Sequence, residues 1–383
     1  MAEAVQSPRT NDFMDPLCLA QLADDTALLA ETMMNLKLKF KRLFQYSADK
    51  HQVPNIQKTL YCNFTESPTY EPIQLDEDLN IKSVDPDKGY RYLGMMFYPT
   101  NDIDECITRN LNKRMGNVAK FYGWLSVNED TPIDIKLMVL DSCVFPALLY
   151  GVECWGDIRC IQSKLLSKEM KALKSITKVK KSTTNDLIYH ELGRCSIISK
   201  IKDRQFIFFN KISKLTRENA MLVSIIEICG ETEIIQYYKN LCNNNAKHEI
   251  QARERRIRES TTSMCMYYCQ LGISKCNIYN SMLHDYYRYV ITRWRLSNHK
   301  LMIEVGRYTN PKTPRAERLC SLCDTVEDEY HAVFTCPKYT NIRRKYDHLL
   351  TSNSISDFLN PSTANARHVA CFLHEIETML EEQ

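Results

Sequence analysis

Residues 21–31 have the sequence Gln21-Leu22-Ala23-Asp24-Asp25-Thr26-Ala27-Leu28-Leu29-Ala30-Glu31. The pair Asp24 and Asp25 stands between apolar segments, so we expect one element to end near the pair and a helix to follow over residues 31–46. Mg²⁺ prefers oxygen ligands, and two such ions can clamp the attacking and leaving oxygens of a phosphoryl transfer. Adjacent aspartates are also frequent at helix starts, where they cap the first turn, so the pair alone leaves both interpretations open.

The segments on either side of this stretch differ in pattern. Residues 1–15 are polar and without periodicity, and we predict a disordered head there. Residues 54–100 are punctuated by prolines, and short segments such as 59–64 and 90–97 suit strands and turns. Helical spacing dominates after residue 102, over residues 104–125, 133–145, 161–176, 185–191, 200–215, 249–259 and 367–380. These patterns predict an α+β fold that is mostly α-helical.

Composition and charge limit the class of protein. The 383 residues are 44% hydrophobic and 25% charged, which is typical of a globular chain with two or three domains. Because the net charge is only +3, attraction to nucleic acid must come from local clusters of basic residues. The N-terminus carries no secretory signal, so we expect an intracellular protein of the nucleus or cytoplasm. The most apolar run, residues 137–155, is interrupted by Asp141, Pro146 and Glu153, and we therefore expect no membrane span.

Four soft ligands lie close together near the C-terminus, namely Cys320, Cys323, His331 and Cys336. Two cysteines separated by two residues present both sulfurs from one knuckle turn, and a later His and Cys can complete a tetrahedron about Zn²⁺. Since no ligand position is left open, the spacing predicts a structural zinc site. So short a segment cannot bury a core of its own, and the metal would provide much of its folding free energy. The alternative is that free thiols of a chain with 16 cysteines fell together by chance.

Several segments, taken in order along the chain, resemble a known family. They are residues 21–31, Asn55-Ile56-Gln57-Lys58-Thr59 with Phe64, Tyr92-Leu93-Gly94, the run from Lys136 to Gly156, Glu191-Leu192-Gly193-Arg194, and the Cys/His segment with Ile303 to Tyr308 before it. Together they resemble the carboxy-terminal part of a non-LTR (LINE-type) retrotransposon reverse transcriptase. The resemblance covers nearly the whole chain after residue 16.

The resemblance implies a domain order and a set of roles. The implied domains are a partial reverse-transcriptase palm at residues 16–100, a helical thumb at 101–215, a helical connection at 216–287 and a small C-terminal zinc-knuckle domain at 288–383. Asp24 would be a metal ligand, Asp25 its supporting neighbour, and Lys58 a proton donor to the leaving pyrophosphate. Polymerases of the family need another metal-binding Asp well before this pair, whereas 23 residues precede Asp24. We therefore expect Mg²⁺ to bind only if upstream residues complete the site, and no polymerase activity from this chain alone.

Basic residues near two of these segments can contact phosphates. They are Lys178, Lys180 and Lys181 in the thumb-like region, and Arg318, Lys338, Arg343 and Arg344 around the Cys/His segment. The alternative is that these basic side chains lie on helix faces exposed to solvent and bind nothing. The arginines of residues 253–258 are interleaved with Glu254 and Glu259, which favours a salt-bridged surface helix. For the aromatic group Tyr286, Tyr287, Tyr289 and Trp294 we predict core packing.

The sequence thus predicts a truncated retrotransposon reverse transcriptase that binds RNA or DNA without sequence readout. Two alternatives stay open. In one, the chain is a fragment of an active RNA-directed DNA polymerase whose upstream part is missing from the gene model. In the other, it is a structural or protein-interaction module in which zinc staples the fold.

Overall fold

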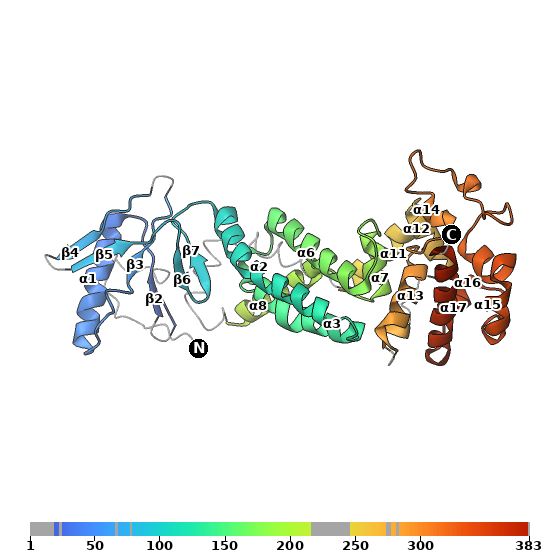
Figure 1. Cartoon of the computed structure of the whole chain (residues 1–383). Helices are drawn as coiled ribbons and strands as arrows, with labels where there is room; N and C mark the ends of the chain where they lie inside the picture. Colours follow the sequence, from blue (N-terminus) through green and yellow to red (C-terminus); the bar gives the residue numbers. More distant parts are fainter. Residues whose placement is uncertain are drawn as a thin grey trace. The chain divides into compact units, whose positions relative to one another are not determined.

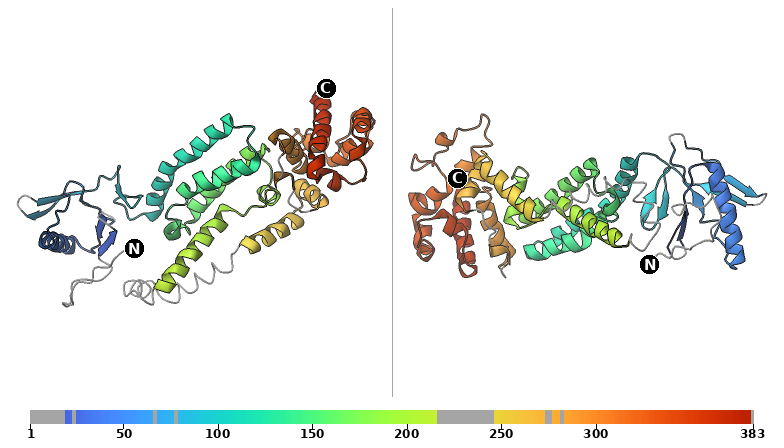
Figure 2. Two further views of the ribbon diagram at one scale, coloured as in Figure 1. Left: turned by 90° about the horizontal axis from the view of Figure 1, so that it is seen from below. Right: turned by 180° about the vertical axis from the view of Figure 1, so that it is seen from behind.

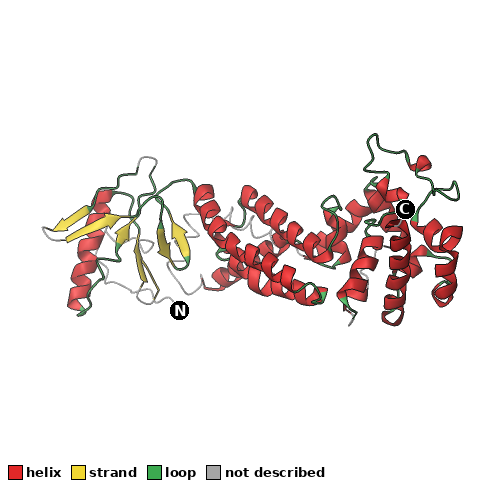
Figure 3. Cartoon of the chain, viewed as in Figure 1, coloured by secondary structure: helices red, strands yellow, loops and turns green. Residues whose placement is uncertain are grey.

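The computed structural model describes residues 19–22, 25–65, 68–76, 79–215, 246–272, 277–280 and 283–381. The chain forms two compact units. Unit 1 comprises the described residues within Met1–Met115, Gly151–Ile161 and Asp203–Asn243, and unit 2 those within Gly116–Tyr150, Gln162–Lys202 and Asn244–Gln383. Helices predominate, and all named strands lie in unit 1 (Figure 3). The predicted class, α+β and mostly α-helical, is therefore confirmed. Within the described ranges, no helix combines the length and the apolarity that crossing a membrane requires.

Asp25 of the acidic pair belongs to a β-hairpin. Strands β1 (Leu19–Leu22) and β2 (Asp25–Leu28) are antiparallel, and Leu22 lies opposite Asp25, so positions 23 and 24 separate the two strands. Asp24 itself lies outside the described residues. Helix α1 (Met33–Asp49) follows, and its N-cap is Thr32, whose hydroxyl accepts the main-chain N–H of Asn35 at 3.2 Å. Since Asp25 is a strand residue and Thr32 caps the helix, Asp25 is not a helix cap.

A small sheet carries the core of unit 1. Its strand order is β3 (Leu60–Tyr61), β5 (Leu79–Ser83), β4 (Ile73–Asp76), with β3 parallel and β4 antiparallel to β5. Side chains alternate along β4, where Ile73 and Leu75 are buried while Gln74 and Asp76 are exposed. Helix α1 lies against this sheet and buries Phe40 in the same core (Figures 1 and 2).

A second hairpin follows, as predicted for residues 90–97. Strands β6 (Tyr90–Tyr92) and β7 (Met95–Phe97) are antiparallel and joined by Leu93 and Gly94. Both turn residues have positive φ, 47° for Leu93 and 81° for Gly94. Positive φ at both positions defines the tight turn that suits the twist of a two-residue hairpin, but it strains a residue with a bulky side chain such as leucine.

Replacing Leu93 with asparagine is therefore expected to raise the free energy of unfolding by about 0.5–1 kcal/mol, since Asn tolerates the left-handed region and Asn-Gly favours this turn. Urea-induced unfolding followed by circular dichroism measures the change. Gly94→Ala is the opposing control and should lower the stability. A Leu93→Asn variant that is less stable than the parent would show that the positive φ of Leu93 does not destabilise the hairpin.

The predicted helices are present, with shifts at their ends. Long helices are α2 (Ile103–Val127), α6 (Arg159–Thr177), α8 (Ile197–Leu215), α11 (Ala246–Glu259), α13 (Asp285–Arg295) and α17 (Thr363–Glu381). Shorter helices are α5 (Val152–Trp155), α7 (Asn185–Glu191), α12 (Ser263–Gln270), α14 (Met302–Val305), α15 (Thr340–Lys345) and α16 (Ile355–Leu359). Short 3₁₀ segments are η3 (Asn277–Asn280), η4 (Arg315–Glu317), η6 (Pro337–Tyr339) and η7 (Asp347–Leu349).

The helix predicted over residues 133–145 is not uniform. It consists of α3 (Ile133–Val139), a π-helical turn η2 (Leu140–Val144) and α4 (Phe145–Leu148). Pro146 has no N–H to donate to the preceding turn, so the regular α-helical hydrogen bonding is interrupted there. Sequence periodicity detects the helix but not this change of winding.

Unit 2 joins segments that are far apart in sequence. Helices α13 and α17 pack side by side, and α11 packs on α7 (Figure 1). Glu191 at the end of α7 is fully buried and accepts hydrogen bonds from Nε and Nη2 of Arg295 at 2.6 and 2.9 Å. Arg194, just after α7, binds both carboxylate oxygens of Asp141 at 2.9 and 2.6 Å. Helix α7 and the Cys/His segment therefore belong to one compact unit, while the predicted domain ranges stay a prediction.

Candidate metal centre

The first two cysteines lie on a small hairpin in unit 2. The N–H of Cys320 donates to the carbonyl of Thr325 at 2.8 Å, and Leu319 and Val326 form an isolated β-bridge. The turn closes because Asp324 adopts a positive φ of 52°, a region that aspartate tolerates better than most residues. The Cys-Ser-Leu-Cys spacing thus forms the predicted knuckle, with both sulfurs on one turn.

The other two candidate ligands come from the segment that follows. His331 begins a π-helical turn, η5 (His331–Thr335), and the N–H of Cys336 donates to the carbonyl of His331 at 2.8 Å. This contact folds Cys336 back beside the imidazole. Pro337 then starts η6, and its missing N–H leaves no hydrogen bond unmade, because the first residue of a helix has no acceptor within the helix.

The four side chains converge as a metal site requires. The Sγ atom of Cys336 lies 3.8 Å from the Sγ atoms of both Cys320 and Cys323, and all four ligand atoms, including one His331 nitrogen, lie within 4.8 Å of one another. Two sulfurs bound at about 2.3 Å to a tetrahedral zinc ion are about 3.8 Å apart, whereas a disulfide needs about 2.0 Å. The cluster can therefore hold a metal such as zinc. It is the one group of three or more potential ligands in the described ranges of the chain.

The protonation of the thiols depends on a cation. Burial, followed by the neighbouring Cys320 and Cys323 thiols, raises the pKa of Cys336 to about 12, and burial also raises the pKa of Cys323. At neutral pH and without a cation, the thiols of Cys323 and Cys336 would stay protonated. A bound divalent ion would stabilise the thiolates instead, and its binding would release protons.

Polar neighbours orient the histidine. The Thr335 hydroxyl lies 3.0 Å from Nδ1 of His331, and an Asp328 carboxylate oxygen accepts the main-chain N–H of His331 at 2.9 Å. If Nδ1–H donates to Thr335, Nε2 is the nitrogen that faces the metal, which is the usual division of roles in a metal-bound imidazole. The prediction from sequence did not include these neighbours. Asp328 precedes His331 by three residues, and this capping spacing is the signal that could have identified it.

Arg318 holds the base of the knuckle rather than projecting freely. Its Nε donates to the carbonyl of Thr313 at 2.9 Å and its Nη1 to the carbonyl of Ile303 at 2.8 Å. The side chain crosses directly over Gly306, where an added Cβ would lie 2.8 Å from Cγ and 2.9 Å from Cδ of Arg318. Gly306 therefore leaves space for the aliphatic part of Arg318.

Replacing Gly306 with alanine is expected to lower the free energy of unfolding by about 1 kcal/mol or more, because the new methyl group displaces an arginine held at both ends. The backbone itself accepts alanine, since φ is −63° at this position. Gly116→Ala is the matched control: a Cβ there meets nothing within 4 Å, so it should stabilise α2 by up to about 1 kcal/mol. Thermal unfolding of both variants measures the two changes in stability. Equal stabilisation by Gly306→Ala and Gly116→Ala would exclude a clash between the new methyl group and Arg318.

Of the other six predicted nucleic-acid residues, four have an ion pair, a hydrogen bond or a ring contact. Paired in the structure are Lys178 with Glu129 (3.3 Å), Lys180 with Glu304 (3.7 Å), and Arg343, which donates to the main-chain carbonyl of Cys336. Lys181 and Arg344 are exposed, and Lys338 is half-buried with its ammonium 5.4 Å from the centre of the Tyr339 ring. Lys181 and Arg344 therefore offer the most accessible positive charge of the predicted set.

Of the predicted catalytic residues, Asp25 and Lys58 lie in unit 1, and Asp24 lies outside the described residues. Asp25 is exposed at the start of β2, and burial together with the nearby Asp25 carboxylate raises the pKa of Tyr92 in β6. The β1–β2 hairpin, which contains Asp25, therefore lies near the β6–β7 hairpin, which contains Tyr92. Lys58 is exposed in a turn, where its main-chain N–H donates to the Asn55 side chain at 3.1 Å. In the described part of unit 1, no hydrogen bond or ion pair joins Lys58 to Asp25.

No family model, no curated protein and no solved structure matches this chain. Its function must therefore be inferred from its residues and their geometry.

Proposed function

We propose that this chain is the carboxy-terminal part of a non-LTR retrotransposon reverse transcriptase and that it binds RNA or DNA through phosphate contacts, without sequence readout. The observation that carries the proposal is the Cys/His cluster, whose four ligand atoms lie within 4.8 Å of one another. Its spacing resembles the terminal knuckle of that family. Zinc is the metal that fits a set of three sulfurs and one nitrogen best.

Two hairpins support the reverse-transcriptase origin. Asp25 opens β2, separated by two positions from the end of β1, which agrees with the acidic turn expected for that family, and the hairpin that resembles the primer-gripping strands lies close to Asp25. An acidic pair at a helix start would have argued against this origin. Asp25 instead opens a strand.

Nucleic-acid binding is tested by titrating a labelled single-stranded oligonucleotide with the zinc-loaded chain at several salt concentrations. Each phosphate contact contributes about −0.7 to the slope of log affinity against log salt. We expect the Lys181→Gln, Arg344→Gln double variant to bind more weakly and to reduce the slope. Arg255→Gln, which removes an exposed charge on α11, is the control and should leave both unchanged. A slope near zero for the parent chain would exclude phosphate contacts.

Polymerase activity is a separate part of the proposal. We expect no primer extension with Mg²⁺ or Mn²⁺ from this chain alone, because a two-metal site needs a further carboxylate beside the acidic pair. Robust synthesis that Asp25→Ala abolishes would contradict this expectation. It would favour the alternative of an active reverse transcriptase.

A structural or protein-interaction module is the second candidate. It is favoured by the finding that Arg318 and Arg343 donate to main-chain carbonyls, which is a structural use of basic residues. This candidate predicts one zinc ion per chain but no affinity for oligonucleotides, so the same titration separates it from the nucleic-acid-binding protein.

A further inference from the structure

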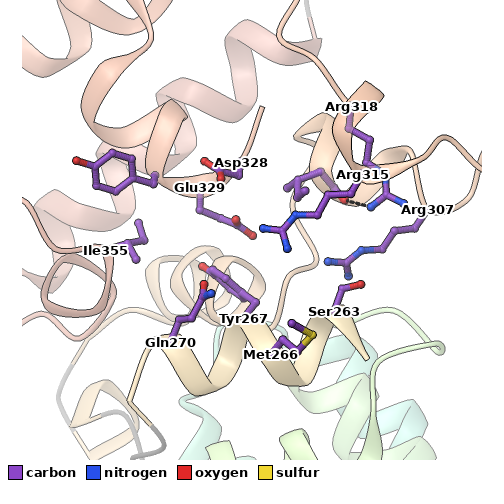
Figure 4. Close-up of a pocket in the computed structure, with 12 residues that line it drawn as sticks. Ser263, Met266, Tyr267, Gln270, Arg307, Arg315, Arg318, Asp328, Glu329 and Ile355 are labelled. Atoms are coloured by element: carbon purple, nitrogen blue, oxygen red, sulfur yellow. Dashed lines mark hydrogen bonds between the residues drawn. The ribbon is translucent and has the colours of Figure 1, made fainter. Parts of the chain in front are cut away.

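A small cavity lies beside the Cys/His segment in unit 2. Its volume is about 70 Å³. Helix α12 forms one side, with Ser263, Tyr267 and Gln270, and the segment that contains Arg307, η4 with Arg315, and Arg318 forms another (Figure 4). Three arginines line this small space together with Asp328 and Glu329, and like charges so close to one another favour an anion between them.

Two of the arginines are directed into the cavity. In Figure 4 the guanidinium groups of Arg307 and Arg315 point into the space above α12, while Arg318 is held by the main chain. Arg307 pairs with Glu304 through Nη1, and its buried Nε has no hydrogen-bond partner in the described part of the chain. Arg315 is exposed, and among the described residues none forms a hydrogen bond or an ion pair with its side chain. Arg315 therefore keeps its donors available for a ligand, and Arg307 has a guanidinium whose hydrogen bonds are not all made.

The carboxylates of the cavity already have partners. Glu329 lies 2.7 Å from Nε2 of His299, and Asp328 accepts the main-chain N–H of His331 at 2.9 Å. Burial, then the charges of Arg307 and Arg315, lower the pKa of Arg318, although Glu304 opposes the shift. The cavity lining holds three arginines and two carboxylates, and Glu304, outside the lining, pairs with Arg307, so Arg315 is the arginine that keeps its charge for a ligand.

The size of the cavity selects the ligand. A bound water needs about 10–15 Å³ of such space, so the cavity has room for about five heavy atoms. A phosphate group has five. A guanidinium can bind two oxygens of a phosphate group at once, through two parallel hydrogen bonds.

We propose that this cavity is a binding site for a phosphate group, held by Arg307 and Arg315 with Ser263 and Gln270 as further donors. Arg318 acts as a positioning residue, because it fixes the loop that carries Arg315. This inference rests in part on the proposed function, since a nucleic acid carries a phosphate group at each nucleotide. The chemistry is shared by a free phosphate ion, a 5′-phosphate end and an internal phosphodiester.

The direct test is calorimetric titration of inorganic phosphate into the zinc-loaded full chain. We expect saturable binding to one site, and Arg315→Gln is expected to weaken it about tenfold or more, since a hydrogen bond to a charged group is worth about 1.5–3 kcal/mol. Arg255→Gln removes the same charge from an exposed position away from the cavity and should leave the affinity unchanged. Circular dichroism of Arg315→Gln checks that the variant is folded.

Oligonucleotides distinguish the sources of the phosphate. A 5′-phosphorylated oligonucleotide that binds more tightly than its 5′-hydroxyl twin, with the difference lost in Arg315→Gln, identifies a terminal phosphate. Equal binding of the two, weakened by Arg315→Gln, identifies an internal phosphodiester. Phosphate binding with no oligonucleotide binding at all supports the cavity and overturns the proposed function instead.

Two results would overturn the cavity proposal. One is the absence of phosphate binding by the folded, zinc-loaded chain. The other is an Arg315→Gln variant that binds phosphate as tightly as the parent. Oligonucleotide binding that persists in either case leaves the proposed function intact, so the two inferences fail separately.

Discussion

Replacing Cys323 with serine is expected to remove zinc from the protein and to lower the free energy of unfolding by about 3 kcal/mol, roughly a quarter of what structural zinc provides in zinc-finger peptides. Serine is a poor ligand for zinc at neutral pH, so three donors remain where four are needed. The segment from Arg318 to Tyr346 has few strands or long helices of its own. Without the metal, the knuckle with Cys320 and Cys323 is no longer joined to the segment with His331 and Cys336.

Cys323 is the best of the three cysteines for this test. It is partly exposed, whereas Cys320 and Cys336 are buried, so a serine at position 323 creates neither a large cavity nor a buried unpaired hydroxyl. The stability change then reports on the metal. Cys143→Ser is the matched control, because Cys143 is exposed in η2 and away from the cluster.

Zinc content and thermal unfolding are the measurements. The parent chain and Cys143→Ser should contain one zinc ion per chain, and a chelator should lower their melting temperature to that of Cys323→Ser. A parent chain purified without stoichiometric zinc, together with an unchanged melting temperature for Cys323→Ser, would remove the basis of the metal site.

Local sequence patterns predicted the elements of this fold well. The strand-and-turn character of residues 90–97 and the helix over residues 185–191 follow from turn residues and apolar spacing, which act within a few positions. The knuckle at Cys320 and Cys323 was predictable for the same reason. Helix α1, in contrast, begins at Met33 rather than at residue 31, because Thr32 provides the cap.

Roles that depend on distant contacts were not predictable. Arg318 was expected to bind nucleic acid, but its place over Gly306 and its bond to Ile303 depend on a loop closed over 15 residues. Arg253 was expected on a surface helix and is 1% exposed, since its guanidinium donates to the carbonyl of Arg194, 59 residues away. Tyr286, expected in the core, is 40% exposed, whereas Trp294 is fully buried as predicted.

The buried ion pair of Glu191 and Arg295 was missed altogether, and it leads to the second large effect. Both side chains are fully buried, and 104 positions separate them. The Glu191 carboxylate also accepts hydrogen bonds from Tyr268 at 2.7 Å and Tyr279 at 3.0 Å. Burial and this carboxylate raise the pKa of Tyr268 well above its usual value, so the phenol stays protonated and keeps donating.

Glu191→Gln is expected to lower the free energy of unfolding by about 3–5 kcal/mol, because it removes the buried carboxylate charge that faces the Arg295 guanidinium while preserving the shape of the side chain. Glu317→Gln removes an exposed carboxylate and should change the stability by less than about 0.5 kcal/mol. Arg295→Met, alone and combined with Glu191→Gln, completes a double-mutant cycle. Because each change alone already removes the Glu191–Arg295 ion pair, the two losses should fall short of additivity by about 1–3 kcal/mol. Additive losses would mean that the two groups do not stabilise each other and that packing alone holds α7 against α13.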